Sequence, residues 1–197
     1  MWSRTVLGHD ALLLMECFII YSMLGWLVES IYMSFCEKKL TNRGFCTTPF
    51  CPIYGFGGVV GYLLLHTLAD NLIALYIAGA IVATIFEFLV AQLMQSVFGK
   101  VWWDYNDKPF NYKGIICLES TIAWGFYAVI IIRHLNQVVV SAAEMIPRQT
   151  GIVLTAIISF VYLFDFVYHV LEAMDVSIRE SRKRIVNNVR EYIRSRR

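Results

Sequence analysis

Long apolar segments alternate with short polar ones along most of this chain. Five apolar segments can be read as helices, at residues 11–35, 56–69, 72–98, 114–132 and 151–173. A helix needs about 20 apolar residues to cross the hydrocarbon core of a bilayer. The pattern therefore predicts an all-α, polytopic membrane helix bundle of about five spans. The second segment is the shortest, and both a full span and a re-entrant segment fit it.

The last stretch of the chain, residues 176–197, has a different pattern. Its apolar residues recur at helical spacing, with basic residues between them. We expect a basic amphipathic helix on the anionic inner leaflet, a cytoplasmic tail separate from the transmembrane domain of residues 1–175. A solvated helix that only fixes the topology is the alternative. The basic residues expected at the membrane surface are Arg182, Lys183, Arg184, Arg190 and Arg194.

The composition agrees with a membrane protein. The chain is 58% hydrophobic and 16% charged, whereas soluble domains are about half apolar and a quarter charged. No small-residue cleavage motif follows the first apolar segment, so we expect a retained span rather than a signal peptide. Cys46 and Cys51 lack the spacing of a metal site, and we expect free thiols because their loop is placed in the reducing cytoplasm.

The distribution of lysine and arginine predicts the orientation in the membrane. Of the 17 such residues, all but Arg4, Arg133 and Arg148 fall in the tail or in the loops after the first and third apolar segments. Basic residues are concentrated on the cytoplasmic side of membrane proteins. We therefore expect a multi-pass protein of the bacterial plasma membrane, with its N-terminus outside and its C-terminus in the cytoplasm.

Several ionisable residues lie inside the apolar segments. Such residues are costly in a bilayer and mark a functional interior by default. Glu29 and Glu87 lie deepest, and we expect both to line a polar cavity. Glu119 lies near the end of its segment, where a long side chain can reach water. His169 is interpreted as a polar partner of Asp165, because no second histidine stands at the spacing of metal ligands.

Two loops that we place in the cytoplasm have unusual sequences. The first, residues 42–58, reads NRGFCTTPFCPIYGFGG, and its prolines prevent a regular helix. The second, residues 99–114, reads GKVWWDYNDKPFNYKG, and its tryptophans suit a membrane interface. Irregular backbone at membrane depth persists only where it is buried in protein or lines water. Both loops are therefore expected to pack around the cavity.

One residue of each loop carries a charge without an evident purpose. We expect Arg43 and Asp104 to lie close together, directly or through one water, and to clamp the two loops over the mouth of the cavity. The alternative is that Asp104 caps the following helix and Arg43 meets a lipid phosphate. The full set of candidate cavity residues is Glu29, Asn42, Arg43, Tyr54, Glu87, Trp103, Asp104, Tyr105, Asn111 and Glu119.

Several motifs in one order carry a resemblance to a known family. They are YSMLGWLVES from residue 21, NRGF from residue 42, CPIYGFG from residue 51, WWDYN from residue 102, PFN from residue 109 and ICLESTIAWG from residue 116, together with the glutamate at residue 87. With these motifs the chain resembles the ABC-transporter type IV, permease-like family of bacterial membrane proteins. The resemblance covers most of residues 18–126 and implies a membrane protein of permease type.

These observations favour a permease-like transport component with a polar cavity open to the cytoplasm. The chain has no GxxxxGK[ST] loop, so an ABC role needs a separate nucleotide-binding subunit. The alternatives are a membrane-embedded enzyme acting on a lipid or other amphiphile at the inner leaflet, and a regulatory or assembly subunit. No catalytic residue, cofactor, metal or nucleic acid is expected. The expected partners are membrane lipid and either a second copy of the chain or the nucleotide-binding subunit.

Overall fold

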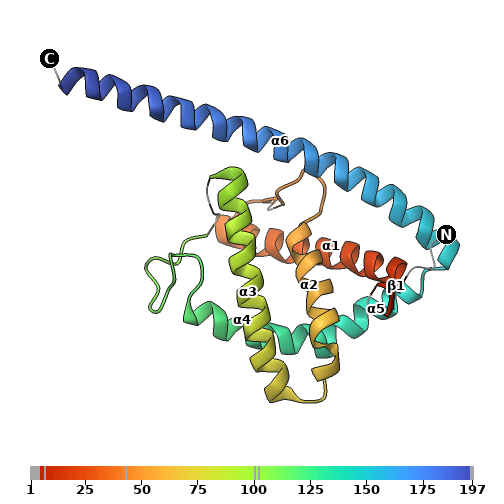
Figure 1. The fold of residues 1–197 in the computed structure, drawn as a ribbon. Coiled ribbons are helices and arrows are strands. Elements are labelled where there is room, and N and C mark those ends of the chain that lie inside the picture. The colour runs from red at the N-terminus through yellow and green to blue at the C-terminus, as the bar shows by residue number, and fades with distance from the viewer. Residues whose placement is uncertain (1–4, 7, 43, 100, 102, 196–197) are drawn as a thin grey trace.

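The computed structural model describes residues 5–6, 8–42, 44–99, 101 and 103–195. Apart from a hairpin of two-residue strands, the fold is all-α, as the sequence predicts (Figure 1). The elements in chain order are β1 (Thr5–Val6), β2 (His9–Asp10), α1 (Ala11–Glu37), α2 (Pro52–Leu65), the 3-10 helix η1 (His66–Leu68), α3 (Leu72–Phe98), α4 (Leu118–Ile130), the π-helix η2 (Ile131–Leu135), α5 (Asn136–Glu144) and α6 (Arg148–Ser195).

The lengths of the apolar helices confirm a membrane protein. Those long and apolar enough to cross a bilayer are Ala11–Glu37, Leu72–Phe98, Leu118–Glu144 and Arg148–Met174, and Pro52–Leu68 is a shorter apolar helix. The fourth helix differs from the predicted segment, because it begins at Leu118 and continues past residue 132 to Glu144. Several residues after 132 are polar, but residues 133–146 include no glycine or proline. The sequence therefore has no helix-breaking residue before Pro147.

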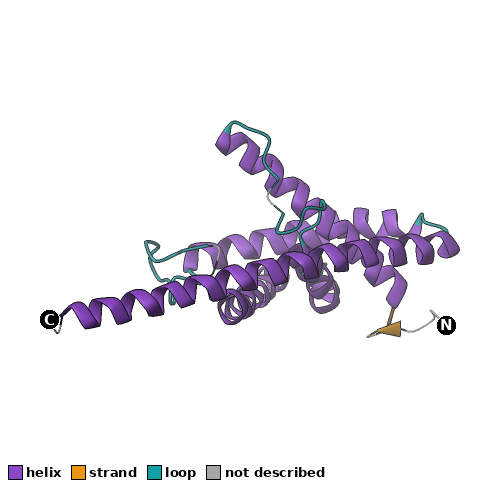
Figure 2. Ribbon diagram, turned by 90° about the horizontal axis from the view of Figure 1, so that it is seen from above, coloured by secondary structure: helices purple, strands orange, loops and turns teal. Residues whose placement is uncertain are grey.

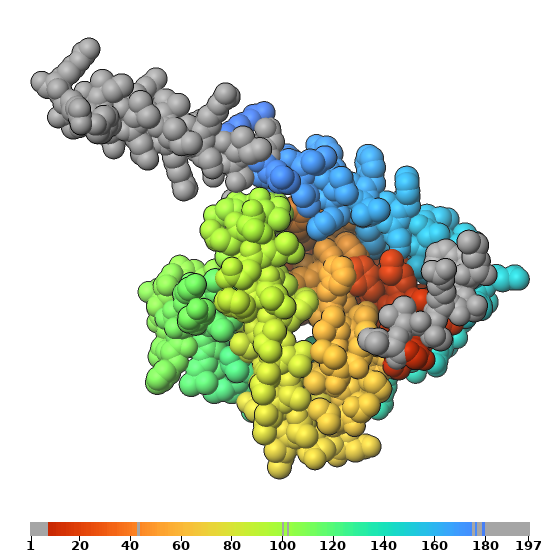
Figure 3. All heavy atoms as spheres, viewed as in Figure 1, coloured from red at the N-terminus to blue at the C-terminus, as the bar shows by residue number. Residues whose placement is uncertain are grey.

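The α2–α3 hairpin crosses the other long helices. A turn at Asp70 and Asn71 joins its arms, and the Asn71 side chain caps α3 by accepting a hydrogen bond from Ala74 N at 3.1 Å. In Figure 1 the two arms run up the page, whereas α6 passes across their upper ends. The space-filling view in Figure 3 shows α2 and α3 side by side on this face.

Small residues allow two pairs of helices to approach closely. A Cβ atom at Gly55 of α2 would lie 2.2 Å from the Ser22 hydroxyl of α1, and one at Gly79 of α3 would lie 2.2 Å from the Ala128 Cβ of α4. Non-bonded carbon atoms prefer separations of about 3.5–4.0 Å. These contacts therefore hold α2 against the middle of α1, and α4 against α3.

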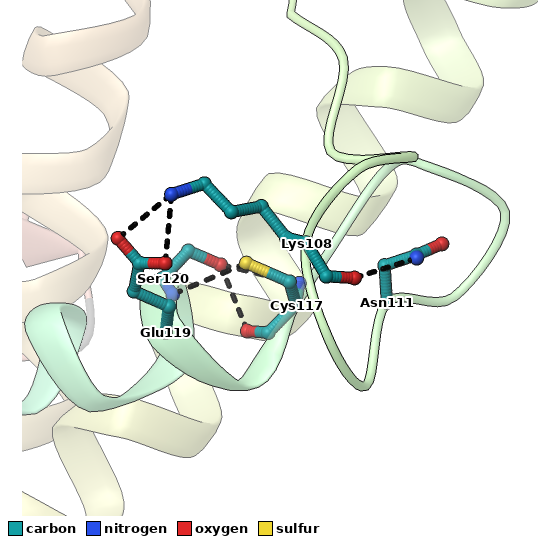
Figure 4. A network of polar contacts seen from close by, with 5 residues as sticks. All are labelled: Lys108, Asn111, Cys117, Glu119 and Ser120. Atoms are coloured by element: carbon teal, nitrogen blue, oxygen red, sulfur yellow. Dashed lines mark hydrogen bonds and ion pairs between the residues drawn. The ribbon is translucent and has the colours of Figure 1, made fainter.

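The two unusual loops fold back along helices instead of passing over their ends. Loop A (residues 38–51) returns to the middle of α1, where Cys51 N donates to Ser22 O at 3.1 Å. Loop B (residues 99–117) returns along α3 to the level of Glu87, where α4 begins. Cys117 and Ser120 cap α4 by bonding to each other's backbone N–H groups (Figure 4). Irregular backbone thus lies beside the middle of two apolar helices, packed against protein.

Helix α6 continues without a break from the last apolar segment into the basic tail. Figure 2 shows its C-terminal part extending past the rest of the molecule. The structure describes the backbone of this part of α6 but not its side chains, so the role of the basic residues expected at the membrane surface stays a prediction. They are Arg182, Lys183, Arg184, Arg190 and Arg194.

Candidate functional site

A buried carboxyl group lies where α3, loop B and α4 meet. The Glu87 residue that carries it is only 7% exposed. The Tyr105 hydroxyl donates to its Oε1 at 3.1 Å, and Trp124 Nε1 and the Ser120 hydroxyl donate to its Oε2 at 3.0 and 3.4 Å. None of the ion pairs found among the described residues includes Glu87. Within the part of the chain that the structure describes, the group therefore has hydrogen bonds but no ion-pair partner.

The packing of α4 on α3 positions two of these donors. Ser120 and Trp124 are four residues apart and so share one face of α4. One helical turn from Glu87, the Thr84 and Thr121 hydroxyl groups are hydrogen-bonded at 3.0 Å across the same interface. The α3–α4 interface therefore fixes which face of α4 meets the carboxyl group.

Loop B positions the third donor through its own hydrogen bonds. Tyr105 N donates to Gly114 O at 2.9 Å, and Trp103 Nε1 donates to Ile115 O at 2.8 Å. The Asn111 amide donates to two carbonyl groups within the loop, at 2.8 and 3.1 Å. Gly114 has a φ of 67°, a conformation that favours glycine. The loop is thus a folded unit that holds the Tyr105 side chain against α3.

A pocket of about 220 Å³ lies beside the buried carboxyl group. Tyr105, Trp124 and Tyr127 contribute aromatic rings to its lining, and Ser120 contributes a hydroxyl. Glu87 lies directly behind this lining, because three of these four residues donate to its carboxyl group. Burial raises the pKa of Tyr105 above its ordinary value, so this phenol stays a neutral donor.

An ion pair lies at the rim of the same pocket. Lys108 Nζ is 3.1 and 2.9 Å from the two carboxylate oxygens of Glu119 (Figure 4). The Glu119 carboxylate raises the pKa of the Lys108 ammonium group. Glu119 belongs to the first turn of α4, where the helix dipole favours a negative charge. Both side chains are substantially exposed, so the pair contributes little to the stability of the fold.

Comparison with protein families shows which family this chain belongs to. The sequence model of the family described as "Putative ABC-transporter type IV" matches residues 16–170. The chain belongs to this family. Comparisons with curated proteins and with solved structures give no significant match. The matched region includes the whole Glu87 site and ends at residue 170, within the apolar part of α6.

The structure brings together part of the set of residues predicted from the sequence. Tyr105 and Glu119 line one pocket, and Glu87 lies behind its lining, hydrogen-bonded to Tyr105. Asp104 accepts hydrogen bonds from the backbone and side chain of Asn106, at 2.9 and 2.7 Å, within loop B. Arg43 lies outside the described residues, so the clamp between Arg43 and Asp104 stays a prediction.

Three further predicted residues, Glu29, Asn42 and Tyr54, belong to a second polar cluster on α1, α2 and loop A, whereas Trp103 and Asn111 lie in loop B. The Tyr54 hydroxyl donates to Glu29 at 2.7 Å, and Trp26 Nε1 donates to the Asn42 side chain at 2.7 Å. The same Asn42 oxygen accepts from Gly44 N at 3.1 Å and so shapes the start of loop A. A single cavity lined by both Glu29 and Glu87 stays a prediction.

Sequence reasoning missed most of the pocket lining, including Lys108, Ser120 and Trp124. The sequence does carry a signal for Ser120 and Trp124, because the motif LESTIAWG places both on one helical face, next to an acidic residue. Nothing in the local sequence pairs Lys108 with Glu119, because the fold of loop B brings them together.

Proposed function

We propose that this chain is a permease-like transport component that binds a small cationic solute at the Glu87 site in exchange for a proton. The observation that carries the proposal is a buried carboxyl group with three hydrogen-bond donors and no cation beside it among the described residues. A carboxylate inside an apolar protein must be neutralised, either by a proton or by a cation. Membership of an ABC-transporter-related family and the apolar helices support a role in transport.

The pocket beside Glu87 suits a small ammonium-like solute. Aromatic rings attract cations over their faces, and Tyr105, Trp124 and Tyr127 supply such rings. The volume of about 220 Å³ is below the roughly 300–1,000 Å³ of pockets for drug-sized ligands. Lys108 presents an ammonium group at the rim, and a solute cation would compete with it for Glu119.

The proposal also places loops A and B on the cytoplasmic side. The lysine and arginine residues of the tail and of both loops support this orientation. The pocket would then open toward the cytoplasm, and energy coupling through a nucleotide-binding subunit would act on the same side.

The test measures binding of radiolabelled tetramethylammonium to the purified full chain in detergent. This probe carries a permanent positive charge, so its own protonation does not vary. We expect Glu87→Gln to weaken binding at least 10-fold, which corresponds to about 1.4 kcal/mol. Glu172→Gln makes the same chemical change at an exposed position of α6 and should bind as the wild type does.

A second arm of the test measures release of the same cation from preloaded proteoliposomes. Release should be faster with the wild-type chain than with the Glu87→Gln variant, after circular dichroism and gel filtration have shown that both are folded. Absence of binding by the wild type, or equal binding by wild type and Glu87→Gln, would refute the proposal.

A further inference from the structure

Three metal-ligating side chains meet where loop A lies on α6. A ligand atom of each of Cys46, Asp165 and His169 lies within 4.8 Å of the other two. Cys46 is 3% exposed, and the side chains of Asp165 and His169 are 14% and 20% exposed. The cluster shares no residue with the Glu87 site, so an inference from it does not depend on the function proposed above.

Hydrogen bonds hold the two α6 ligands in place. Asp165 and His169 are four residues apart on one face of the helix. Asp165 Oδ2 accepts from the backbone N–H and the hydroxyl of Thr48, at 2.8 and 2.6 Å. Its other oxygen, Oδ1, lies 3.2 Å from Nδ1 of the neighbouring His169 ring. Loop A therefore holds the Asp165 carboxylate through Oδ2, beside the imidazole ring of His169.

The imidazole ring is oriented by contacts of the kind that surround metal-binding histidines. His169 Nδ1 lies 2.8 Å from Asp165 O, a backbone carbonyl that fixes the ring and favours the tautomer with a lone pair on Nε2. Nε2 lies 3.2 Å from the Thr47 hydroxyl. The Phe45 ring packs 6.0 Å from the imidazole and 5.8 Å from the Phe166 ring. Loop A thus covers the cluster with apolar surface and keeps the donors together.

We propose that Cys46, Asp165 and His169 bind a Zn²⁺ ion that fastens loop A to α6. A thiolate, an imidazole and a carboxylate are the ligands that zinc takes in proteins, whereas Mg²⁺ and Ca²⁺ prefer oxygen ligands alone. Three protein ligands leave one tetrahedral position for water. Because an ion bound only by the folded chain stabilises it, zinc would strengthen the attachment of loop A, which leads directly into α2.

The cysteine ligand lies far from the other two ligands in the sequence, so no local motif predicts this site. Cys46 belongs to loop A, whereas Asp165 and His169 belong to α6, and no zinc motif has such spacing. The hydrogen bonds from Thr47 and Thr48 to α6, together with the packing of Phe45, bring the thiol to the other two ligands.

The test uses Co²⁺ as a spectroscopic probe on the purified full chain, treated with chelator and carrying Cys36→Ser to remove an exposed thiol. We expect a thiolate-to-cobalt charge-transfer band that Zn²⁺ abolishes by displacement. Cys46→Ser should remove this band, and Asp165→Asn or His169→Gln should weaken Co²⁺ affinity at least 10-fold. Cys117→Ser, which removes a buried thiol at the start of α4, should leave the band unchanged.

A second measurement protects the test against a variant that fails to fold. With all other cysteines present, Zn²⁺ should slow alkylation of Cys46 in detergent at least 10-fold, as measured by mass spectrometry of peptides, and should leave alkylation of Cys117 unchanged. Absence of the charge-transfer band in the parent protein, persistence of the band in Cys46→Ser, or alkylation of Cys46 at the same rate with and without Zn²⁺ would overturn the proposal.

Discussion

Replacing Gly79 by alanine is expected to force α3 and α4 apart and to loosen the Glu87 site, about two helical turns away along α3. The added Cβ would lie 2.2 Å from the Ala128 Cβ. Carbon atoms at optimal separation are about 3.5–4.0 Å apart, so the helices must separate locally by about 1.5 Å. A shift of that size at Trp124 would lengthen its 3.0 Å hydrogen bond to Glu87 beyond hydrogen-bonding distance.

The expected loss of stability follows from overpacking. Extra methyl groups in well-packed interiors cost about 1–3 kcal/mol. Ala128→Gly should rescue the variant, because the new Cβ at residue 79 would then meet Ala128 Cα at 3.7 Å and Leu65 Cδ1 at 3.9 Å, which are ordinary contacts. Ala128→Gly alone costs about 1 kcal/mol as a glycine inside a helix. The double variant should therefore lose less stability than the sum of the single variants.

The assay is unfolding of the purified protein in mixed micelles with increasing sodium dodecyl sulfate, followed by tryptophan fluorescence. Gly61→Ala is the matched control, because its Cβ would meet only Ile132 Cδ1, at 3.9 Å. Tetramethylammonium binding should fall in Gly79→Ala and recover in the double variant. If Gly79→Ala is as neutral as Gly61→Ala, or if the losses in the double variant simply add, the packing argument is wrong.

Three further predictions concern hydrogen bonding, pH and thiol reactivity. Tyr105→Phe removes one donor to the Glu87 carboxyl group and should lower the free energy of unfolding by about 1–3 kcal/mol, with no loss expected for the same change at the exposed Tyr112. The Arg148 guanidinium beside Asp10 lowers the pKa of the Asp10 carboxyl group. The stability that this ion pair contributes is present above the unfolded-state pKa of the carboxyl group and is lost as pH falls through the folded-state pKa. Between pH 6 and pH 3 the free energy of unfolding of the wild type should therefore fall by about 0.2–1 kcal/mol more than that of Asp10→Asn, which keeps the helix cap. Parallel pH profiles of the two proteins would contradict this prediction. Burial raises the pKa of the Cys46 thiol to about 11. In chelator-treated protein, maleimide should therefore modify the exposed Cys36 faster than Cys46. Equal rates of modification at the two thiols would show that loop A is open.

Much of the fold could be predicted because it depends on local properties of the chain. The lengths of the apolar segments fix the membrane class, and the two residues between the second and third segments fix a hairpin. The predicted end of the fourth helix at residue 132 is wrong, because the polar residues that follow are compatible with a helix and residues 133–144 stay helical. Within the site, Glu87, Tyr105 and Glu119 could be singled out because ionisable and aromatic groups are unexpected at those depths.

The sequence by itself determined which residues are costly in a membrane, since that cost depends only on residue type and on the apolar segment around it. Tertiary structure alone decided which partners meet them. The close contact of Gly79 with Ala128 sets the register of α4 on α3, and that register brings Trp124 to Glu87. The return of loop A to α6 likewise brings Cys46 to ligands far away in the sequence. Partner choice depends on helix register and loop path, and these are fixed by close packing between segments that no local pattern records.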